Sequence, residues 1–335
     1  FNNPSNVTSI YTVYGKVSSN GNNFTNDKLS LNNKNNNYNF EGVKNPFTVI
    51  SSPSSVGEIP KTFDLRYYGW VSPVKNQGFM GACWMFGSLG ALESALMRYA
   101  NVTYSLSVNN AQNSILKYSK YGTVNTVEGG SAFGAMTYLI DWLGVFPEEY
   151  DGYDELGKIS SLFITPENIH IENAVCVPAR KNALDNNPIK EALMKYGVLS
   201  VSHRADFDQS KYYNPAHAAQ YYTGTIKEGT HRVCVVGWND TYSRDNFLTK
   251  PSGDGAWICK NSWGTDWGDK GYFYISYYDL SFASEESVTY IITNDTYNRI
   301  YQNDVGGQLA KYNVNCYRSN FIADADELIA AIGTY

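Results

Sequence analysis

One cysteine of this chain stands where a reactive thiol could be built. No proline interrupts the chain between Cys83 and Ala100, and apolar residues recur there at roughly helical spacing. This pattern predicts a buried helix of about four turns that begins at Cys83. Free N–H groups and the positive dipole end of a helix N-terminus favour the thiolate, the nucleophilic form of cysteine. A side-chain amide, Gln77, lies just upstream.

A nucleophilic thiol needs a base, and the chain offers four histidines. His231 opens the apolar run 233–238, which predicts a buried strand and so places this imidazole on a rigid element. A second strand is expected at 255–260, and it leads directly into Asn261. If the two strands pair as an antiparallel hairpin, Asn261 can accept a hydrogen bond from the ring of His231 and fix its tautomer. Cysteine, histidine and asparagine would then form a triad.

Several motifs in the same order resemble those of the papain-like cysteine peptidases, from about residue 59 to residue 293. The segment 59–66 resembles the start of the mature enzyme. The resemblance implies four catalytic residues: the nucleophile Cys83, the general base and acid His231, the orienting residue Asn261 and the oxyanion-hole donor Gln77.

The same resemblance implies residues around a substrate cleft. Trp263 matches the tryptophan that shields the histidine–asparagine pair from water, and Gly129 and Gly130 match the glycine pair against which substrate backbone lies. The pocket for the side chain two before the scissile bond is expected to be lined by Ala132, Ser202 and Arg232, with Glu285 or Glu286 at its base. Because the residue after the histidine is usually alanine, Arg232 predicts a more polar pocket. The alternative is that this long side chain turns to solvent.

The fold that the resemblance implies is an α+β papain-like fold in two domains. A helical half would carry Cys83 at the head of its central helix, and a β-barrel-like half would carry His231 and Asn261, with the cleft between them. Apolar spacing predicts further helices over 106–119 and 133–143, and a last core strand over 287–292. The disulfide usual in animal and plant members cannot form, because Met80 and Val127 occupy the positions of its cysteines.

Segments of different character flank the expected peptidase domain, 59–296. Residues 1–40 contain thirteen asparagines, a polar bias that cannot pack a core. We expect residues 1–58 to be either a propeptide, lying across or near the cleft and removed on activation, or a surface-display linker. Residues 297–335 predict a β extension too short to close by itself. It is similar to the start of the lectin-like domain that follows the papain-like one in microbial surface peptidases, including clostridial enzymes that process S-layer proteins.

Composition narrows the classes of function. The 335 residues, of which 43% are hydrophobic, suffice for one two-layered enzyme domain with extensions, and a formal charge of −6 argues against nucleic acid. The five cysteines form no metal-spacing motif, so we expect no metal or cofactor, and Cys234 and Cys259 are predicted to be buried reduced thiols. No apolar run approaches the roughly 20 residues of a membrane span. Five Asn-X-Ser/Thr sequons suit a secreted or surface protein.

These observations predict a cysteine endopeptidase that is secreted or displayed at the cell surface as a zymogen, and that acts as a monomer on protein or peptide substrates. Association with the cell wall or surface is an open expectation. The thiolate would attack a peptide carbonyl and form a thioester that water hydrolyses. Two alternatives stay open: an adhesin-like surface binding protein with an inactive peptidase domain, and an acyltransferase, in which an amine takes the acyl group in place of water.

Overall fold

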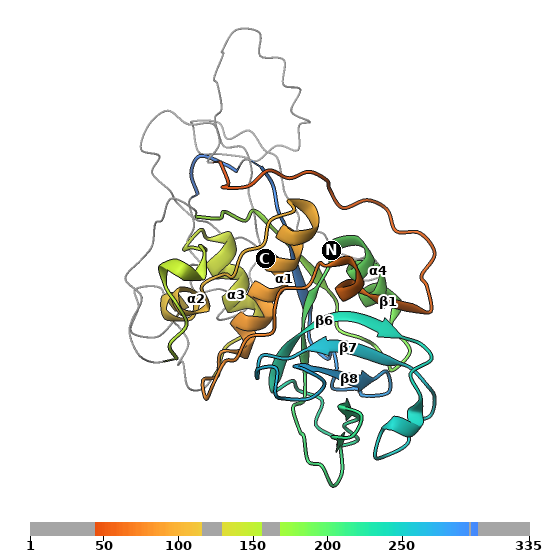
Figure 1. Cartoon of the computed structure of the whole chain (residues 1–335). Coiled ribbons are helices and arrows are strands. Elements are labelled where there is room, and N and C mark those ends of the chain that lie inside the picture. Colours follow the sequence, from red (N-terminus) through yellow and green to blue (C-terminus); the bar gives the residue numbers. More distant parts are fainter. Residues whose placement is uncertain (1–43, 116–128, 156–167, 295, 301–335) are drawn as a thin grey trace, which may run out of the picture.

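The computed structural model describes residues 44–115, 129–155, 168–294 and 296–300. In these residues a group of helices packs beside a twisted β-sheet, and the central helix lies along the boundary between the two parts (Figure 1). The arrangement confirms the α+β papain-like fold expected from the sequence. The predicted β extension from residue 301 onward and residues 1–43 lie outside the described residues.

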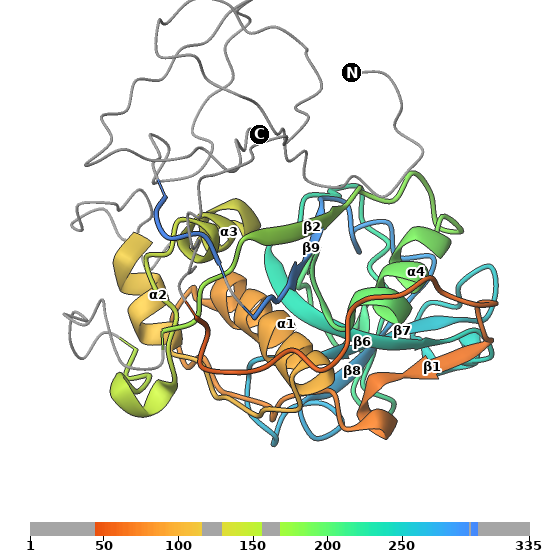
Figure 2. The ribbon, with the colours of Figure 1, turned by 90° about the horizontal axis from the view of Figure 1, so that it is seen from above.

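The helical part is built around α1 (Cys83–Tyr99), the central helix that the sequence predicts. Most of its side chains are buried, because it packs on α2 and α3 at one side and on the sheet at the other (Figure 2). Helix α2 (Val108–Ile115) lies within the predicted range 106–119, of which 116–119 are not described. The predicted helix 133–143 is α3 (Ala132–Ile140). It ends early because Trp142 adopts a left-handed conformation, with φ of 54°.

The sheet part consists, among the described residues, of one nine-stranded sheet in the order β2-β9-β3-β6-β7-β8-β5-β4, with β1 paired to β6. Helix α4 (Asn187–Tyr196) precedes β3 and packs near β6 and β9. The strands are β1 (Thr62–Asp64), β2 (Asn173–Val177), β3 (Leu199–His203), β4 (Tyr213–Asn214), β5 (Ala219–Gln220), β6 (His231–Asn239), β7 (Ala256–Lys260), β8 (Tyr272–Ser276) and β9 (Ser287–Ile291). Three short 3₁₀ helices complete the described elements: η1 (Leu65–Tyr68), η2 (Glu148–Tyr150) and η3 (Arg244–Asn246).

The predicted hairpin of β6 and β7 is confirmed. The two strands pair antiparallel, with Cys234 opposite Lys260 and a register shift between Val235 and Gly237. This pairing brings the first residue of β6 near the residue that follows β7. Cys234 and Cys259 are buried free thiols, as expected, and they are not directly opposite each other.

Residues 44–50 run against the body of the protein at the end of α1 remote from Cys83. Asn45 Nδ2 donates to Thr293 O at 2.9 Å, and Ile50 N–H donates to Tyr99 O at 2.7 Å. Phe47 is buried in the hydrophobic core. The 17 residues of α1 place Tyr99 roughly 24 Å along the helix axis from Cys83. These contacts hold residues 45–50 against the core and the far end of α1, so this stretch does not lie in the expected cleft.

Candidate active site

Three side chains from different elements meet at the boundary of the two parts. Cys83 is the first residue of α1, where Ala82 caps the helix without a side-chain hydrogen bond. His231 begins β6, and its Nε2 lies 2.8 Å from Asn261 Oδ1. The Cys83 thiol lies close enough to the same imidazole for hydrogen-bond and charge interactions to couple the two groups. The structure thus brings together the cysteine, histidine and asparagine of the sequence-predicted triad.

Opposite pKa shifts favour an ion pair between thiol and imidazole. Burial raises the pKa of the half-buried Cys83 thiol, but the hydrogen bonds and charges of His231 and Arg232 together outweigh burial, so the pKa falls below its ordinary value. Burial lowers the pKa of His231, but hydrogen bonds and charge from Cys83 and Asn261 raise it above its ordinary value. The thiolate and the imidazolium therefore stabilise each other.

Gln77 lies on the turn that leads to Cys83, and its amide is oriented by two hydrogen bonds. Oε1 accepts from the Ser262 hydroxyl at 2.6 Å, and Nε2 donates to Met80 O at 2.7 Å. The Gln77 N–H also donates to Ser262 O at 2.8 Å. Since a primary amide has two N–H donors, the bond to Met80 O uses one of them and leaves the other N–H for a further acceptor. Ser262 was not among the site residues expected from the sequence, although its position directly after Asn261 is a usable signal.

Aromatic rings cover the histidine from one side. The indole of Trp263 lies 4.9 Å from the imidazole of His231, measured between centroids. Phe207 and Trp267 each lie 5.1 Å from Trp263. This cluster limits the access of water to the bond between His231 and Asn261. Trp263 therefore lies where the resemblance to the family placed it.

The predicted glycine pair lies against the start of α1. Gly129 has a φ of +92°, a conformation that favours glycine, and it lies beside Gly81. A Cβ at Gly130 would stand 2.4 Å from the ring of Trp84, the residue after the nucleophile. Both positions therefore require glycine. Ala132, the first residue of α3, is buried.

Arg232 does not turn to solvent. Its guanidinium is buried, and it donates to Ser200 O and Glu286 O at 3.0 Å each and to the carboxylate of Glu285 at 3.4 Å. Ser202 lies opposite Arg232 on β3, and its buried hydroxyl has no hydrogen-bond partner among the described residues. The Glu285 side chain is half exposed, so it presents the charge of this group to solvent.

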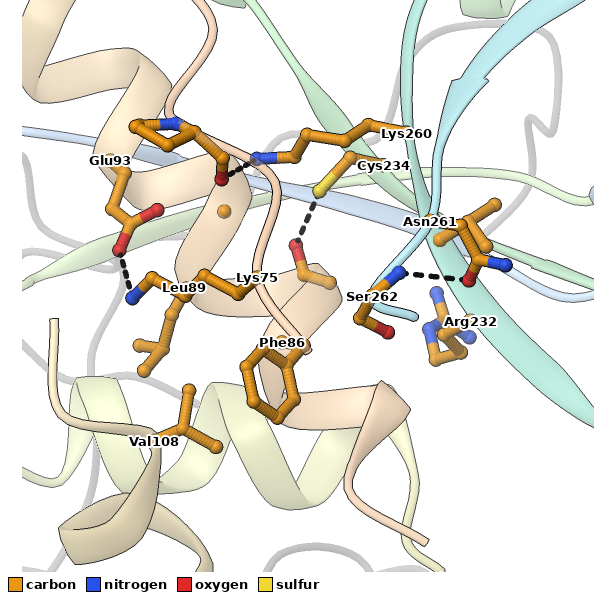
Figure 3. Close-up of a pocket in the computed structure, with 14 residues that line it drawn as sticks. Lys75, Phe86, Leu89, Glu93, Val108, Arg232, Cys234, Lys260, Asn261 and Ser262 are labelled. Carbon is orange, nitrogen blue, oxygen red and sulfur yellow. Dashed lines mark hydrogen bonds and ion pairs between the residues drawn. The ribbon is translucent and has the colours of Figure 1, made fainter. Parts of the chain in front are cut away.

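A small cavity lies behind the site, where α1 meets β6 and β7 (Figure 3). Asn261 and Ser262 line one wall, and Phe86 and Leu89 line the other. Lys75 Nζ pairs there with Glu93 at 2.9 Å. Cys83 is not part of its lining, so this cavity is a gap in the packing between the two parts and not the substrate cleft.

Two negative findings apply to the described part of the chain alone. There, no three His, Cys, Asp or Glu side chains are grouped so that they could hold a metal ion. In the same residues, no helix combines the length and the apolar character that crossing a membrane requires.

Comparison with known proteins defines the class. Residues 59–292 match the papain family of cysteine proteases. A cathepsin L-like peptidase of Aedes aegypti is 32% identical over 231 residues, which cover 69% of this chain and 62% of the relative. Cathepsin K of Gallus gallus is 32% identical over 229 residues, which cover 68% of this chain and 62% of the relative. The chain therefore belongs to the papain family of cysteine proteases, and it spans about three fifths of the length of these relatives.

Solved structures similar to this chain include a surface-layer-associated cysteine protease. The cysteine protease and lectin-like domains of Cwp84, a surface layer associated protein of Clostridium difficile, match with a TM-score of 0.62 and 27% identity, over 74% of this chain and 55% of that chain. Clostridial Cwp84 after propeptide cleavage matches with a TM-score of 0.60 and 29% identity, over 68% of this chain and 58% of that chain. Bromelain of Ananas comosus shares the fold, with a TM-score of 0.54 and 23% identity over 70% of this chain and 100% of that chain.

Proposed function

We propose that this protein is a cysteine endopeptidase that hydrolyses peptide bonds through Cys83, His231 and Asn261. One observation carries the proposal: the imidazole of His231 interacts with the Cys83 thiol and also lies 2.8 Å from Asn261 Oδ1. This is the arrangement in which a histidine accepts a proton from a nucleophile while a third residue fixes its tautomer. Membership of the papain family supports the same activity.

In the proposed mechanism the Cys83 thiolate attacks the carbonyl carbon of the scissile peptide. The resulting oxyanion accepts hydrogen bonds from the free N–H of the Gln77 amide and from the backbone N–H of Cys83. The His231 imidazolium gives its proton to the leaving amine, and the C–N bond breaks to leave a thioester on Cys83. His231, now neutral, takes a proton from water, whose oxygen attacks the thioester and releases the acid and the thiolate.

Labelling with an epoxide inhibitor selective for papain-like thiols, followed by peptide mapping, tests the proposed catalytic pair. We expect stoichiometric modification at Cys83 in the intact chain and none in His231→Ala. Should the intact chain stay unlabelled, the same experiment on a chain trimmed to Ile59 separates a blocked cleft from an inactive site. An unlabelled trimmed chain would favour the adhesin-like alternative.

The likeness to Cwp84, a surface layer associated protein, leads us to propose that the chain is secreted or displayed at the cell surface as a monomer and cleaves extracellular proteins. We also propose that residues 1–58 and 297–335 flank the peptidase domain as a processed segment and a β extension. Incubation of the pure chain under reducing conditions should then produce cleavage before Ile59. An uncut chain would contradict autocatalytic processing.

For substrate selection we propose a polar pocket lined by Ala132, Ser202 and Arg232. The buried guanidinium of Arg232 supports this, because it pairs with the half-exposed carboxylate of Glu285 and so keeps a charged group beside the proposed pocket. A peptide library should therefore show a polar preference two residues before the scissile bond, and Glu285→Gln should weaken it. A bulky apolar preference that is indifferent to Glu285→Gln and Arg232→Ala would contradict the proposal.

A further inference from the structure

Two side chains of one loop form hydrogen bonds with the backbone of the turn that carries Gln77. The Tyr153 hydroxyl donates to Gln77 O at 2.7 Å. The Glu155 carboxylate accepts a hydrogen bond from the Phe79 N–H at 3.2 Å. These two contacts hold the backbone on either side of Gly78. Neither belongs to the triad, and neither residue was singled out by the sequence.

The turn is shaped to receive the carboxylate. Gly78 has a φ of +61°, and a Cβ built there would lie 2.2 Å from Glu155 Oε1. A side chain at this position would push the carboxylate away, besides straining the backbone. The absence of a side chain at Gly78 is therefore what allows Glu155 to contact the turn.

Tyr153 and Glu155 both contact helices of the helical part. The ring of Tyr153 packs edge-on against Phe86 of α1, with centroids 4.9 Å apart. Gln112 of α2 donates through Nε2 to Glu155 O at 3.0 Å. Glu155 has a φ of 59°, and a non-glycine residue persists in that region when its surroundings hold it there. Contacts with α1 and α2 therefore fix the two loop residues that hold the turn.

We propose that Tyr153 and Glu155 are positioning residues that aim the Gln77 amide at the developing oxyanion, an inference that rests on the proposed function. Ser262 orients the amide oxygen of Gln77, while Tyr153 and Glu155 fix the backbone from which the side chain projects. Oxyanion-hole donors act through their fixed position, and a displacement of about 1 Å can reduce the rate by about 10²-fold.

The test compares peptide hydrolysis with simple alkylation of Cys83 by iodoacetamide, a reaction that forms no oxyanion. We expect Tyr153→Phe and Glu155→Ala each to lower kcat by about tenfold, with KM within about twofold, because a preorganised donor is displaced and not removed. Alkylation should keep its wild-type rate. Glu155→Gln should retain wild-type kcat, because its amide oxygen still accepts from the Phe79 N–H.

Matched controls separate the possible failures. Tyr67→Phe changes a tyrosine that is 86% exposed and should have no effect. Gln77→Ala should lower kcat by about 10²–10³-fold, and adding Tyr153→Phe to it should lower kcat no further. If Gln77→Ala costs nothing, the oxyanion role in the proposed function is wrong, and the inference with it. If Gln77→Ala is impaired but Tyr153→Phe and Glu155→Ala are not, the inference alone is wrong. Equal losses in hydrolysis and alkylation would show a merely structural role and also overturn it.

Discussion

The two sides of the site are held in different ways. His231 begins β6 and Asn261 follows β7, so the backbone hydrogen bonds of paired strands set both positions. Gln77 instead lies on a turn. That turn is held by the backbone bond from the Gln77 N–H to Ser262 O and by the side chains of Ser262, Tyr153 and Glu155. Paired strands share many backbone hydrogen bonds and tolerate the loss of one. The turn has few bonds, so the loss of one should displace Gln77 more than it would displace His231 or Asn261.

Two histidines lie side by side on the paired strands, yet their chemistry differs. His203 on β3 lies directly opposite His231 on β6, with ring centroids 5.5 Å apart. Burial and the nearby charge of His231 hold the pKa of His203 well below its ordinary value, while Cys83 raises that of His231. Both rings occupy the same sheet, so the neighbouring thiol and not the strand makes His231 the base.

The largest effect is expected from removing the base on the strand side. His231→Ala should lower kcat/KM for peptide hydrolysis by about 10⁴-fold, because it removes the imidazole that accepts the thiol proton and returns it to the leaving amine. Steady-state kinetics on a fluorogenic peptide measure this loss. His217→Ala, at an exposed histidine in the turn between β4 and β5, should match wild type. A strong loss in that control would move the base to a different histidine.

The two sides should also be separable by pH. The thiolate of Cys83 exists above its lowered pKa, so activity is lost as pH falls through that value. The His231 imidazolium exists below its raised pKa, so activity is lost as pH rises through it. The profile of kcat/KM should be a bell that falls about tenfold per pH unit beyond each limb. Alkylation of Cys83 should lose only the acidic limb; loss of the basic limb as well would contradict the assignment of the two groups.

Much of the strand side was predictable from the sequence. The apolar run after His231 and the strand that leads into Asn261 each show local periodicity, and pairing them as a hairpin sufficed to place the two side chains together. Helix α1 was equally clear, since its apolar spacing is continuous from Cys83. For Gln77 the resemblance to the family supplied the expectation, and the turn itself carries no periodic signal.

What the sequence did not reveal depends on contacts between distant segments. Tyr153 and Gln77 are 76 residues apart, as are Glu155 and Phe79, and no spacing rule links them. The buried position of Arg232 was equally hidden, because acceptors on β3 and before β9 are what keep its guanidinium from solvent. The path of residues 44–50 depends on the hydrogen bonds of Asn45 to His170 and Thr293. Composition alone would place an asparagine in a polar loop, so no signal in the sequence indicated these contacts.

An intermediate effect is expected at Ser262, which joins the strand side to the turn. Ser262→Ala removes the donor to Gln77 Oε1 and should lower kcat by about tenfold, since the amide can then rotate away from the oxyanion. The alkylation rate of Cys83 should not change. Ser252→Ala, at an exposed serine, is the control. Unchanged kcat in Ser262→Ala would show that the turn is held well enough without this bond.

The smallest effect on catalysis is expected far from both sides, at Asn45. Its amide donates to His170 O and Thr293 O and accepts from the His170 N–H, at 3.2, 2.9 and 2.8 Å. Asn45→Ala leaves these backbone groups unpaired and should lower the free energy of unfolding by about 1–3 kcal/mol, measured by urea denaturation. Ser52→Ala, in the exposed part of the same segment, should have no effect on stability.

Since the Asn45 amide contacts the backbone of His170 and Thr293 and none of the proposed catalytic residues, kcat/KM of the folded Asn45→Ala enzyme should equal that of wild type. Stability and activity would then be separable in this segment, in contrast to the turn at Gln77, where one lost bond changes the rate and leaves the thiol reactive. A fall in kcat/KM of the folded variant would mean that residues 44–50 act on the site through α1, and that the helix on which Cys83 stands is less rigid than its burial indicates.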